Sequence, residues 1–411
     1  MAKPKIRFKG YQEDWEQRKL GEFGKTTGGT SIESEFNELG KYKVISIGSY
    51  SETSKYNDQG IRANKTNKTE SRILNKNNLT MILNDKTASG NIIGRVLLID
   101  ADDSYVFNQR TERIEVYENE YLPEFLYHFL NADNIREKII RAAQGNTQIY
   151  VNWNSISELS YKIPLSKHEQ RKIADLFNQL DNLITLHQRK CDQTKKLKKF
   201  MLQKMFPQNG KKVPELRFSE FTDDWEQRKL GDWGTFYYGR SCPKWSVTED
   251  ATIPCIRYGE LYTKFGAKID KVYSYTNMSP ESLRFSKGTE VLIPRVGEDP
   301  MDYNHCTWLS MPDVAIGEMI SVFNTENNPL FTATMFNATL QNEFAMRVEG
   351  GSVTNLYFEK LKNIDVLFPS LEEQEKIATY FDSLDHLITL HQRKYEELQK
   401  VKKFMLQNMF V

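Results

Sequence analysis

One octapeptide occurs twice in this chain and constrains its fold more than any other feature. LITLHQRK stands at Leu183–Lys190 and, letter for letter, at Leu387–Lys394. Both copies lie inside a longer match between Glu169–Lys190 and Glu373–Lys394, in which 16 of 22 positions are identical. Solenoid repeats have periods of about 20 to 50 residues. Copies that lie 204 residues apart therefore indicate a duplicated domain plan.

The duplicated frame has further pieces in the same order. They are KKFMLQKMF at 198–206 with KKFMLQNMF at 402–410, and DWEQRKLG at 14–21 and again at 224–231. Between these pieces lie two regions, about 22–144 and 232–349, that barely resemble each other. A constant frame around dissimilar inserts suggests one task that both halves share and one task that differs between them.

The repeated segment has the pattern of a long helix with a coiled-coil seam. Apolar residues recur at alternating intervals of four and three, and neither Pro nor Gly interrupts residues 169–206. At 1.5 Å per residue, such a helix is a rod of about 55 Å. Packing the two copies on each other is the simplest way to bury so long a stripe. The residues expected at this helix and partner interface are Phe177, Leu180, Ile184, His187, Phe381, Leu384, Ile388 and His391.

The two histidines of the seam occupy equivalent places in the repeat. His187 and His391 could together bind a metal ion, but a pair of satisfied interhelical histidines is the interpretation that we favour. No metal site is therefore predicted in this chain.

The two variable regions have a mixed pattern of strands and helices. Short apolar runs such as Thr80–Leu83 and Glu290–Ile293 indicate strands, and one helix is expected late in each region, at Pro123–Ala142 and Pro329–Met346. The sequence therefore predicts an α/β (α+β) chain with two mixed domains, two long antiparallel coiled-coil helices and an internal pseudo-twofold repeat. The expected segments are a first domain at 1–165, a first spacer helix at 166–206, a linker at 207–222, a second domain at 223–370 and a second spacer helix at 371–411.

Composition and motifs exclude several classes of protein. No apolar run approaches the ~18 residues that a membrane-spanning helix requires. The four cysteines form no CxxC pair, so neither a disulfide framework nor a zinc site is expected, and a reducing cytoplasm suits the chain. GEFGKTTGG at 21–29 is too short between its glycines for a phosphate-binding loop, and SCPK at 241–244 lacks the companions of an SxxK enzyme. Two rival interpretations remain open, a coiled-coil scaffold without nucleic acid and a fused methyltransferase or nuclease.

The frame resembles the specificity subunits of type I restriction-modification systems. The resemblance rests on DWEQRKLG at both domain starts and on the IP and FP turns before EQRKIA and EQEKIA. It also rests on LDNLITLHQRK and LDHLITLHQRK, which run into the KKFMLQ segments. The resemblance covers the organisation of the whole chain, and it is specific in the frame and weak in the variable regions.

This resemblance implies a division of labour between the chain and its partners. Each variable region looks like a target recognition domain that reads one half of a bipartite site in double-stranded DNA. The helices look like a spacer that also docks two modification methyltransferase subunits. Those subunits would bind S-adenosylmethionine, and motor-nuclease subunits would use ATP and Mg²⁺. The chain itself would be non-catalytic and would carry no cofactor, in agreement with the absence of catalytic motifs.

Base-reading residues should be polar or basic and should lie on loops that can reach the major groove. In the first variable region we expect DNA contacts from Arg62, Lys86, Thr87, Ser89, Asn91, Arg110, Asn146 and Gln148. In the second we expect them from Arg240, Arg257, Tyr258, Arg284, Arg295 and Ser352. The alternative for any one of them is a solvated loop side chain or a local salt bridge.

The charge of the variable regions limits how they can bind DNA. Residues 21–145 contain 16 Lys and Arg against 18 Asp and Glu, a net charge of −2. Residues 231–350 contain 10 against 15, a net charge of −5. Since neutralisation of phosphates supplies much of the affinity for DNA, we expect the isolated chain to bind DNA weakly and the partners to supply much of the positive charge.

Overall fold

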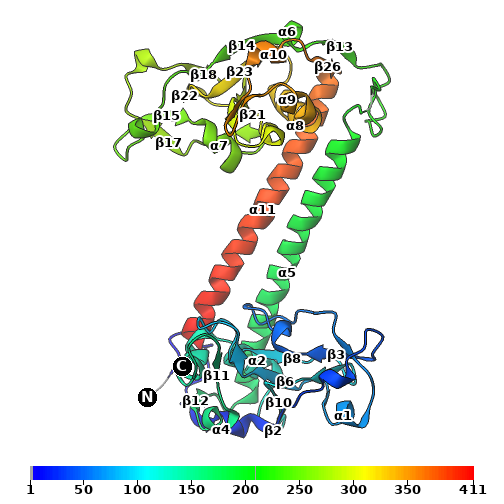
Figure 1. The fold of residues 1–411 in the computed structure, drawn as a ribbon. Coiled ribbons are helices and arrows are strands. Elements are labelled where there is room, and N and C mark those ends of the chain that lie inside the picture. Colours follow the sequence, from blue (N-terminus) through cyan, green and yellow to red (C-terminus); the bar gives the residue numbers. More distant parts are fainter. Residues whose placement is uncertain (1–2, 209) are drawn as a thin grey trace. The chain divides into compact units, whose positions relative to one another are not determined.

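The computed structural model describes residues 3–208 and 210–411, so Asn209 of the expected linker lies outside the described residues. The chain forms two compact units (Figure 1). The first unit comprises Met1–Gln188 and Arg393–Val411, and the second unit comprises Arg189–Gln392. Each unit therefore contains one mixed α/β domain and a segment of each long helix.

Two four-stranded sheets form the domain of the first unit. One sheet has the order β2-β10-β6-β8, in which β10 is antiparallel to both β2 and β6, and the other has the order β4-β3-β9-β5, with β3 parallel to β9. Two short antiparallel pairs, β1–β12 and β11–β7, complete the strands. The bounds are β1 Glu16–Lys19, β2 Gly24–Gly28, β3 Tyr42–Ile45, β4 Arg62–Ala63, β5 Ile73–Leu74, β6 Leu79–Ile82, β7 Asn84–Asp85, β8 Val96–Leu98, β9 Tyr105–Phe107, β10 Thr111–Val116, β11 Ile149–Tyr150 and β12 Ser160–Ile163.

The second unit repeats this plan with a dissimilar sequence. Its larger sheet has the order β14-β23-β19-β21-β16 and its smaller sheet the order β17-β15-β22-β18. The pairs β13–β26 and β20–β25 correspond to β1–β12 and β7–β11, and β24 adds one strand beside β25. The bounds are β13 Glu226–Lys229, β14 Gly234–Tyr238, β15 Ile253–Ile256, β16 Lys268–Ile269, β17 Ser274–Thr276, β18 Phe285–Lys287, β19 Glu290–Pro294, β20 Val296–Gly297, β21 Thr307–Leu309, β22 Pro312–Ile316, β23 Ile320–Thr325, β24 Glu349–Gly350, β25 Thr354–Asn355 and β26 Asp365–Phe368.

Each domain carries two consecutive helices where one was expected. The expected helix Pro123–Ala142 is in fact α2 (Pro123–Leu130) and α3 (Asp133–Arg141), and Pro329–Met346 is α8 (Pro329–Thr339) and α9 (Gln341–Ala345). The first break lies at Ala132, whose backbone is extended (φ −68°, ψ 134°). The side chain of the preceding Asn131 bonds both to the backbone N–H (2.9 Å) and to the carbonyl (2.8 Å) of Val96 on β8 and so fixes the end of α2 against that strand. The remaining short helices are α1 Asn67–Glu70, α4 Trp153–Ile156, α6 Leu230–Trp233, α7 Tyr258–Thr263 and α10 Phe358–Leu361.

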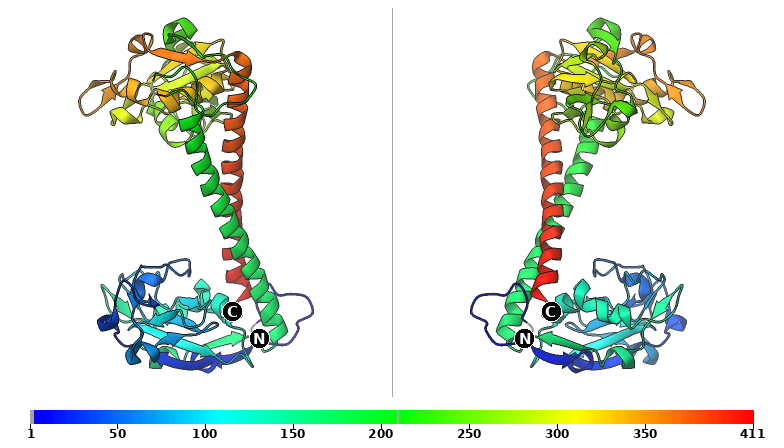
Figure 2. Two further views of the ribbon diagram at one scale, coloured as in Figure 1. Left: turned by 90° about the vertical axis from the view of Figure 1, so that its right-hand side faces the viewer. Right: turned by 90° about the vertical axis from the view of Figure 1, so that its left-hand side faces the viewer.

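The two long helices are α5 (Lys167–Lys204) and α11 (Leu371–Met409), and they confirm the expected pair of antiparallel helices. Within the first unit, Asp181 of α5 forms an ion pair of 2.6 Å with Lys402 near the end of α11. Within the second unit, Lys198 near the end of α5 forms the equivalent ion pair, also 2.6 Å, with Asp385. In each unit the early part of one helix thus packs against the late part of the other (Figure 2).

A buried carboxylate joins each domain to the first turn of its long helix. Glu169 accepts two hydrogen bonds from the guanidinium of Arg7, at 2.6 and 2.9 Å, and a longer contact of 3.4 Å from the indole N–H of Trp15. In the second unit Glu373 makes the same contacts with Arg217, at 2.8 Å twice, and with Trp225, at 3.4 Å. These contacts link the repeated DWEQRKLG block to the repeated EQ(R/E)KIA block.

An aromatic side chain near the end of each long helix enters the domain core of its unit. In the first unit the ring of Phe410 lies 5.3 Å from Phe129 and 5.5 Å from Phe177, measured between ring centroids. In the second unit Phe206 lies 5.8 Å from Phe331 and 5.9 Å from Phe381. One helix therefore contributes its beginning, and the other its end, to the same hydrophobic core.

This packing predicts the effect of removing one ring. Phe410→Ala should lower the free energy of unfolding of the first unit by about 3–5 kcal/mol, because it leaves a cavity among buried aromatic rings. Phe404→Ala on the same helix is the control, since that side chain is 55% exposed. Denaturant unfolding of both variants measures the difference, and equal stability of the two would contradict the packing described.

Candidate nucleic-acid interface

A loop after β7 in the first domain is held at both ends and exposed in its middle. The buried carboxylate of Asp85 accepts hydrogen bonds from the backbone N–H of Thr87 (3.0 Å) and of Ile92 (2.8 Å). Asp85 thereby holds the loop from Thr87 to Ile92, and the side chains of Lys86, Thr87 and Ser89 are exposed. Asp85 thus fixes the backbone of the loop, and three of the expected DNA-contacting residues remain exposed to solvent.

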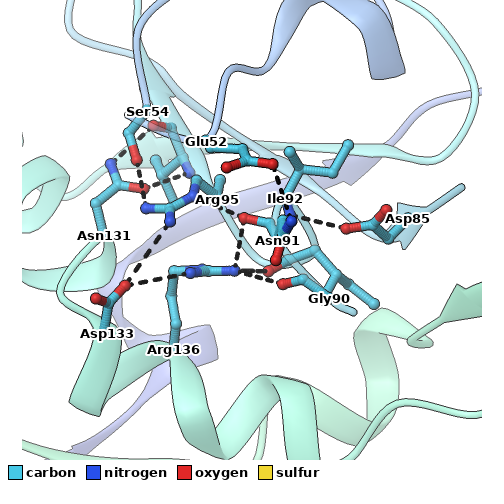
Figure 3. Close-up of polar contacts among 12 residues, drawn as sticks. Glu52, Ser54, Asp85, Gly90, Asn91, Ile92, Arg95, Asn131, Asp133 and Arg136 are labelled. Carbon is cyan, nitrogen blue, oxygen red and sulfur yellow. Dashed lines mark hydrogen bonds and ion pairs between the residues drawn. The ribbon is translucent and has the colours of Figure 1, made fainter. Parts of the chain in front are cut away.

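Two arginines support the far side of this loop (Figure 3). Arg136 of α3 is buried, and its guanidinium donates to the carbonyls of Gly90 (2.8 Å) and Asn91 (3.1 Å). Arg95 donates to the carbonyl of Asn91 (3.0 Å), and both arginines lie within ion-pair distance of Asp133. Burial, to which the neighbouring Arg95 cation adds, lowers the pKa of Arg136 to about 10, so the group remains charged at neutral pH.

A second exposed turn lies beside this loop. Strand β11 pairs with β7, with Ile149 opposite Asp85 and Tyr150 opposite Asn84, and the turn 145–148 precedes β11. The turn requires Gly145, whose φ of +102° belongs to the left-handed region and whose position leaves a Cβ only 2.2 Å from a backbone oxygen. The expected residues of the loop and of the turn therefore come together at one edge of the domain, although they are far apart in the sequence. They are Lys86, Thr87, Ser89 and Asn91 with Asn146 and Gln148.

The remaining two residues expected in the first domain have different surroundings. Arg110 is exposed and stacks over the ring of Tyr150 at 6.0 Å, next to the turn. Arg62 lies on β4 of the other sheet and makes two hydrogen bonds of 2.9 Å with the carboxylate of Asp58. The structure thus places Arg110 with the loop and the turn and gives Arg62 a local ion pair instead.

The second domain has the same paired loops with other side chains. Strand β20 pairs with β25, and Ser352 lies exposed in the turn between β24 and β25. The loop after β20 carries Glu298, Asp299 and Met301 where the first domain has Lys86, Thr87 and Ser89, so it is acidic. Among the expected residues, Arg295 immediately precedes β20 and is partly buried.

The other residues expected in the second domain lie around an open depression or on the sheet. Arg257 and Tyr258 line a depression of about 280 Å³, together with Ser241 and Lys244, and Arg240 is exposed next to Ser241. Arg284 donates a hydrogen bond of 2.8 Å to the carbonyl of Tyr238 at the end of β14. Arg284 directly precedes β18 of the smaller sheet, so this bond links that sheet to β14 of the larger sheet.

The residues expected at the helix interface fall mainly on the inner side of α5 and α11. Phe177, Leu180 and Ile184 are buried on α5, and Phe381 and Leu384 are buried on α11. Ile388, His187 and His391 are partly buried. In the described ranges 3–208 and 210–411, no group of three or more His, Cys, Asp or Glu side chains could hold a metal ion, and no helix is long and apolar enough to cross a membrane.

The sequence analysis did not name the residues of an exposed apolar surface that the same helices carry. We call it the outer apolar patch, and in each unit it consists of four large side chains at equivalent positions of the repeat, all between 41% and 55% exposed. The sequence does indicate this surface, because apolar residues occur in both copies of the repeat at positions outside the seam. Its members are Leu183, Leu186, Val401 and Phe404 in the first unit and Leu387, Leu390, Leu197 and Phe200 in the second.

Comparisons with known proteins agree on one family. The model of the type I restriction modification DNA specificity domain matches residues 12–196 and 313–400. The putative type I restriction enzyme MjaX specificity subunit of Methanocaldococcus jannaschii is 27% identical over 71% of this chain and 66% of its own length. The MjaVIII specificity subunit of the same organism is 22% identical over 95% of this chain and 91% of its own length.

Solved structures show the same fold at low sequence identity. The S subunit of a type I restriction-modification system from M. genitalium superimposes with a TM-score of 0.65 at 16% identity, covering 100% of this chain and 99% of that chain. A chain from a study of complex assembly and conformational transition of the type I R-M system superimposes with a TM-score of 0.53 at 16% identity, covering 97% and 98%. This likeness supports the fold of two sheet-rich domains with two central helices.

The arginine under the first loop generates a prediction about loop order. Arg136→Met should destabilise the first domain by about 1–3 kcal/mol, because the carbonyls of Gly90 and Ile93 lose their arginine donor. Amide hydrogen exchange in residues 86–94 should become faster. Arg141→Met, on the exposed side of the same helix, is the matched control and should leave this exchange unchanged. Unchanged exchange in both variants would show that Arg136 does not support the loop.

Proposed function

We infer the function of this chain from the family to which it belongs, that of the type I restriction modification DNA specificity domain. Membership is shown by the family model, which matches residues 12–196 and 313–400 and so covers more than half of the chain. Both long-helix regions and the first domain fall largely within the match. Our proposals concern what each part of the chain does.

We propose that each domain reads one half of a bipartite DNA site. One observation carries this proposal, namely that the two domains share a strand order but differ in the side chains on the same paired loops. In the first domain these loops present Lys86, Thr87, Asn146 and Gln148, whose donors and acceptors suit base edges. In the second domain the same place carries Arg295 and Ser352 and an acidic loop. Two frames that present different groups are suited to two different half-sites.

The charges support weak DNA binding by the isolated chain. The two variable regions have net charges of −2 and −5, so only local groups such as Lys86 and Arg110 can approach phosphates favourably. Since each neutralised phosphate contributes to a steep dependence on salt, partners have to supply most of the cationic surface. Tight, salt-resistant binding by the isolated chain would contradict this proposal.

The outer apolar patches are proposed to dock two copies of one modification subunit. Large apolar side chains that remain exposed on a helix after it has packed are candidates for an interaction site. The same four positions are exposed in both units, so two identical partners would find two equivalent surfaces. The methyltransferase subunits would bind S-adenosylmethionine and methylate adenine, and motor-nuclease subunits would use ATP and Mg²⁺. This chain would contribute recognition and would be non-catalytic in the cytoplasm.

A methylation map tests the function directly. The chain is co-expressed with its modification subunit in a host without DNA methylation, and modified bases are located by sequencing. The expected result is methyl-adenine in both halves of a bipartite motif, because two domains read the site. An assembled complex that methylates a single continuous motif would contradict the division into two half-sites.

The docking proposal predicts a change in stoichiometry. Leu186→Glu combined with Phe404→Glu should reduce the modification subunits bound per chain from two to one, because only the patch of the first unit acquires charges. Leu39→Glu is the control, since Leu39 belongs to the first unit, is 95% exposed and lies outside the patch. Native mass spectrometry of the purified complex counts the subunits, and retention of two in the double variant would contradict this docking surface.

A further inference from the structure

The two domains differ at one position whose backbone contacts are the same in both. In the first domain the N–H of Leu83 donates to the carbonyl of Arg110 (2.8 Å), and its carbonyl accepts from the N–H of Val151 (2.8 Å). In the second domain the N–H of Arg295 donates to the carbonyl of Met319 (3.2 Å), and its carbonyl accepts from Leu356 (2.8 Å). Leu83 of the first domain and Arg295 of the second are therefore structurally equivalent. Leu83 lies between β6 and β7, and Arg295 lies between β19 and β20.

The equivalent position holds different chemistry in each domain. Leu83 is partly buried and packs against the hydrophobic core of the first domain. Arg295 instead lies over two aromatic rings, with its guanidinium carbon 4.5 Å from the centroid of Tyr238 and 5.2 Å from that of Tyr357. The ring of Tyr238 is itself held by a hydrogen bond of 2.7 Å from its hydroxyl to Glu359. Two rings, one of them hydrogen-bonded, thus contact the guanidinium before any ligand arrives.

The guanidinium of Arg295 retains donors for a ligand. No carboxylate of the described residues lies within ion-pair distance of it, whereas Arg228 and Arg347 in the same unit pair with Glu226 and Glu343. Its Nη1 makes only a long contact of 3.4 Å with the carbonyl of Glu318, so the terminal Nη groups, rather than the buried Nε, are the donors that a ligand would use. An arginine that is ordered by stacking but lacks an acidic partner is suited to bind a planar acceptor pair.

A neighbouring arginine shows what a purely structural role looks like in this fold. Arg284 donates 2.8 Å to the carbonyl of Tyr238, and Arg72 of the first domain donates 2.7 Å to the carbonyl of Gly28 at the equivalent end of β2. Because this arginine and its contact occur in both domains, they belong to the shared frame. Arg295 has no such counterpart, so it belongs to what distinguishes the two domains.

We propose that Arg295 is a specificity-determining residue that reads a guanine in the half-site of the second domain. The proposal rests on the function inferred above, in which this domain reads one half of a bipartite site. A guanidinium presents two parallel N–H donors, and guanine presents O6 and N7 as two acceptors in the major groove. Tyr238 and Tyr357 act as positioning residues, because the stack preserves the orientation of the donors and so reduces the ordering that binding requires.

The test measures discrimination by the assembled complex with its modification subunits. The methylated motif of the wild-type complex is determined first, and duplexes are then prepared in which each G·C pair of the motif is replaced in turn by A·T. For one such pair the wild-type complex should lose about 10- to 100-fold in methylation rate, the range for one bidentate contact. Arg295→Gln should abolish this discrimination at that pair only and leave the other half-site unchanged.

Further variants separate base reading from a structural role. Arg228→Gln is the neutral control, because Arg228 also stacks on a ring, Trp233 at 4.8 Å, but pairs with Glu226. Arg284→Lys should lower thermal stability without changing the motif. Tyr357→Phe should retain the discrimination, and Tyr357→Ala should weaken it, because only the latter removes a stacking ring. If the glutamine variant fails to assemble, Arg295→Lys, which keeps the charge but loses the planar fork, should show the same loss.

The outcomes distinguish this inference from the proposed function. A wild-type complex that produces no bipartite motif would overturn the proposed function, and this inference with it. A bipartite motif whose G·C discrimination is the same in wild type and in the Arg295 variants would overturn the inference alone. A motif without any G·C pair would also overturn the inference alone.

Discussion

The structure depends on a carboxylate buried in the first turn of each long helix. Glu169 and Glu373 are each about 1% exposed, and each is bound by an arginine and a tryptophan from the start of its domain. Removing one partner of such a pair leaves an uncompensated buried charge, which costs about 3–5 kcal/mol. The amide of the next residue, Gln170 or Gln374, bonds further backbone groups of the same domain. These contacts explain why DWEQRKLG and the EQ(R/E)KIA segments recur together, since each block supplies one side of the same junction.

The junction leaves the domain surfaces free to differ. The sheets of both domains have corresponding strand orders, and the structural arginine at the end of β2 and β14 is retained as Arg72 and Arg284. The paired loops at β7–β11 and β20–β25 carry lysine, threonine and amide side chains in one domain and a stacked arginine in the other. The same backbone frame therefore holds two different sets of hydrogen-bonding groups, which is what two half-sites of different sequence would require.

The frame could be predicted from the sequence, because its signals are local and are written twice. The four-three spacing indicated both long helices, and the apolar runs Thr80–Leu83 and Glu290–Ile293 indicated the equivalent strands β6 and β19. The break between α2 and α3 could not be predicted, because it lies at the extended residue Ala132, beside a contact between Asn131 and Val96 that only the tertiary fold creates.

The candidate site was predictable as a region and not residue by residue. Lys86, Ser89, Asn146 and Gln148 meet because β7 pairs with β11, and no sequence pattern reports that pairing. Arg62 and Arg295 could not be distinguished in the sequence, because both are arginines of a variable region. In the structure Arg62 is neutralised by Asp58, whereas Arg295 lies over the rings of two tyrosines that are distant in the sequence. The partner of a charged side chain, rather than its type, decides whether it is available to DNA.

The most direct measurement is a methylation map of a chain in which the second variable region is duplicated. Residues 232–349 replace residues 22–144, so both units carry the same reading loops on the unchanged frame. The account predicts that the methylated site then contains two copies of one half-site, the one that the second domain reads in the wild-type complex. A wild-type motif, or a motif in which both halves become new sequences, would contradict the claim that each domain reads its own half independently.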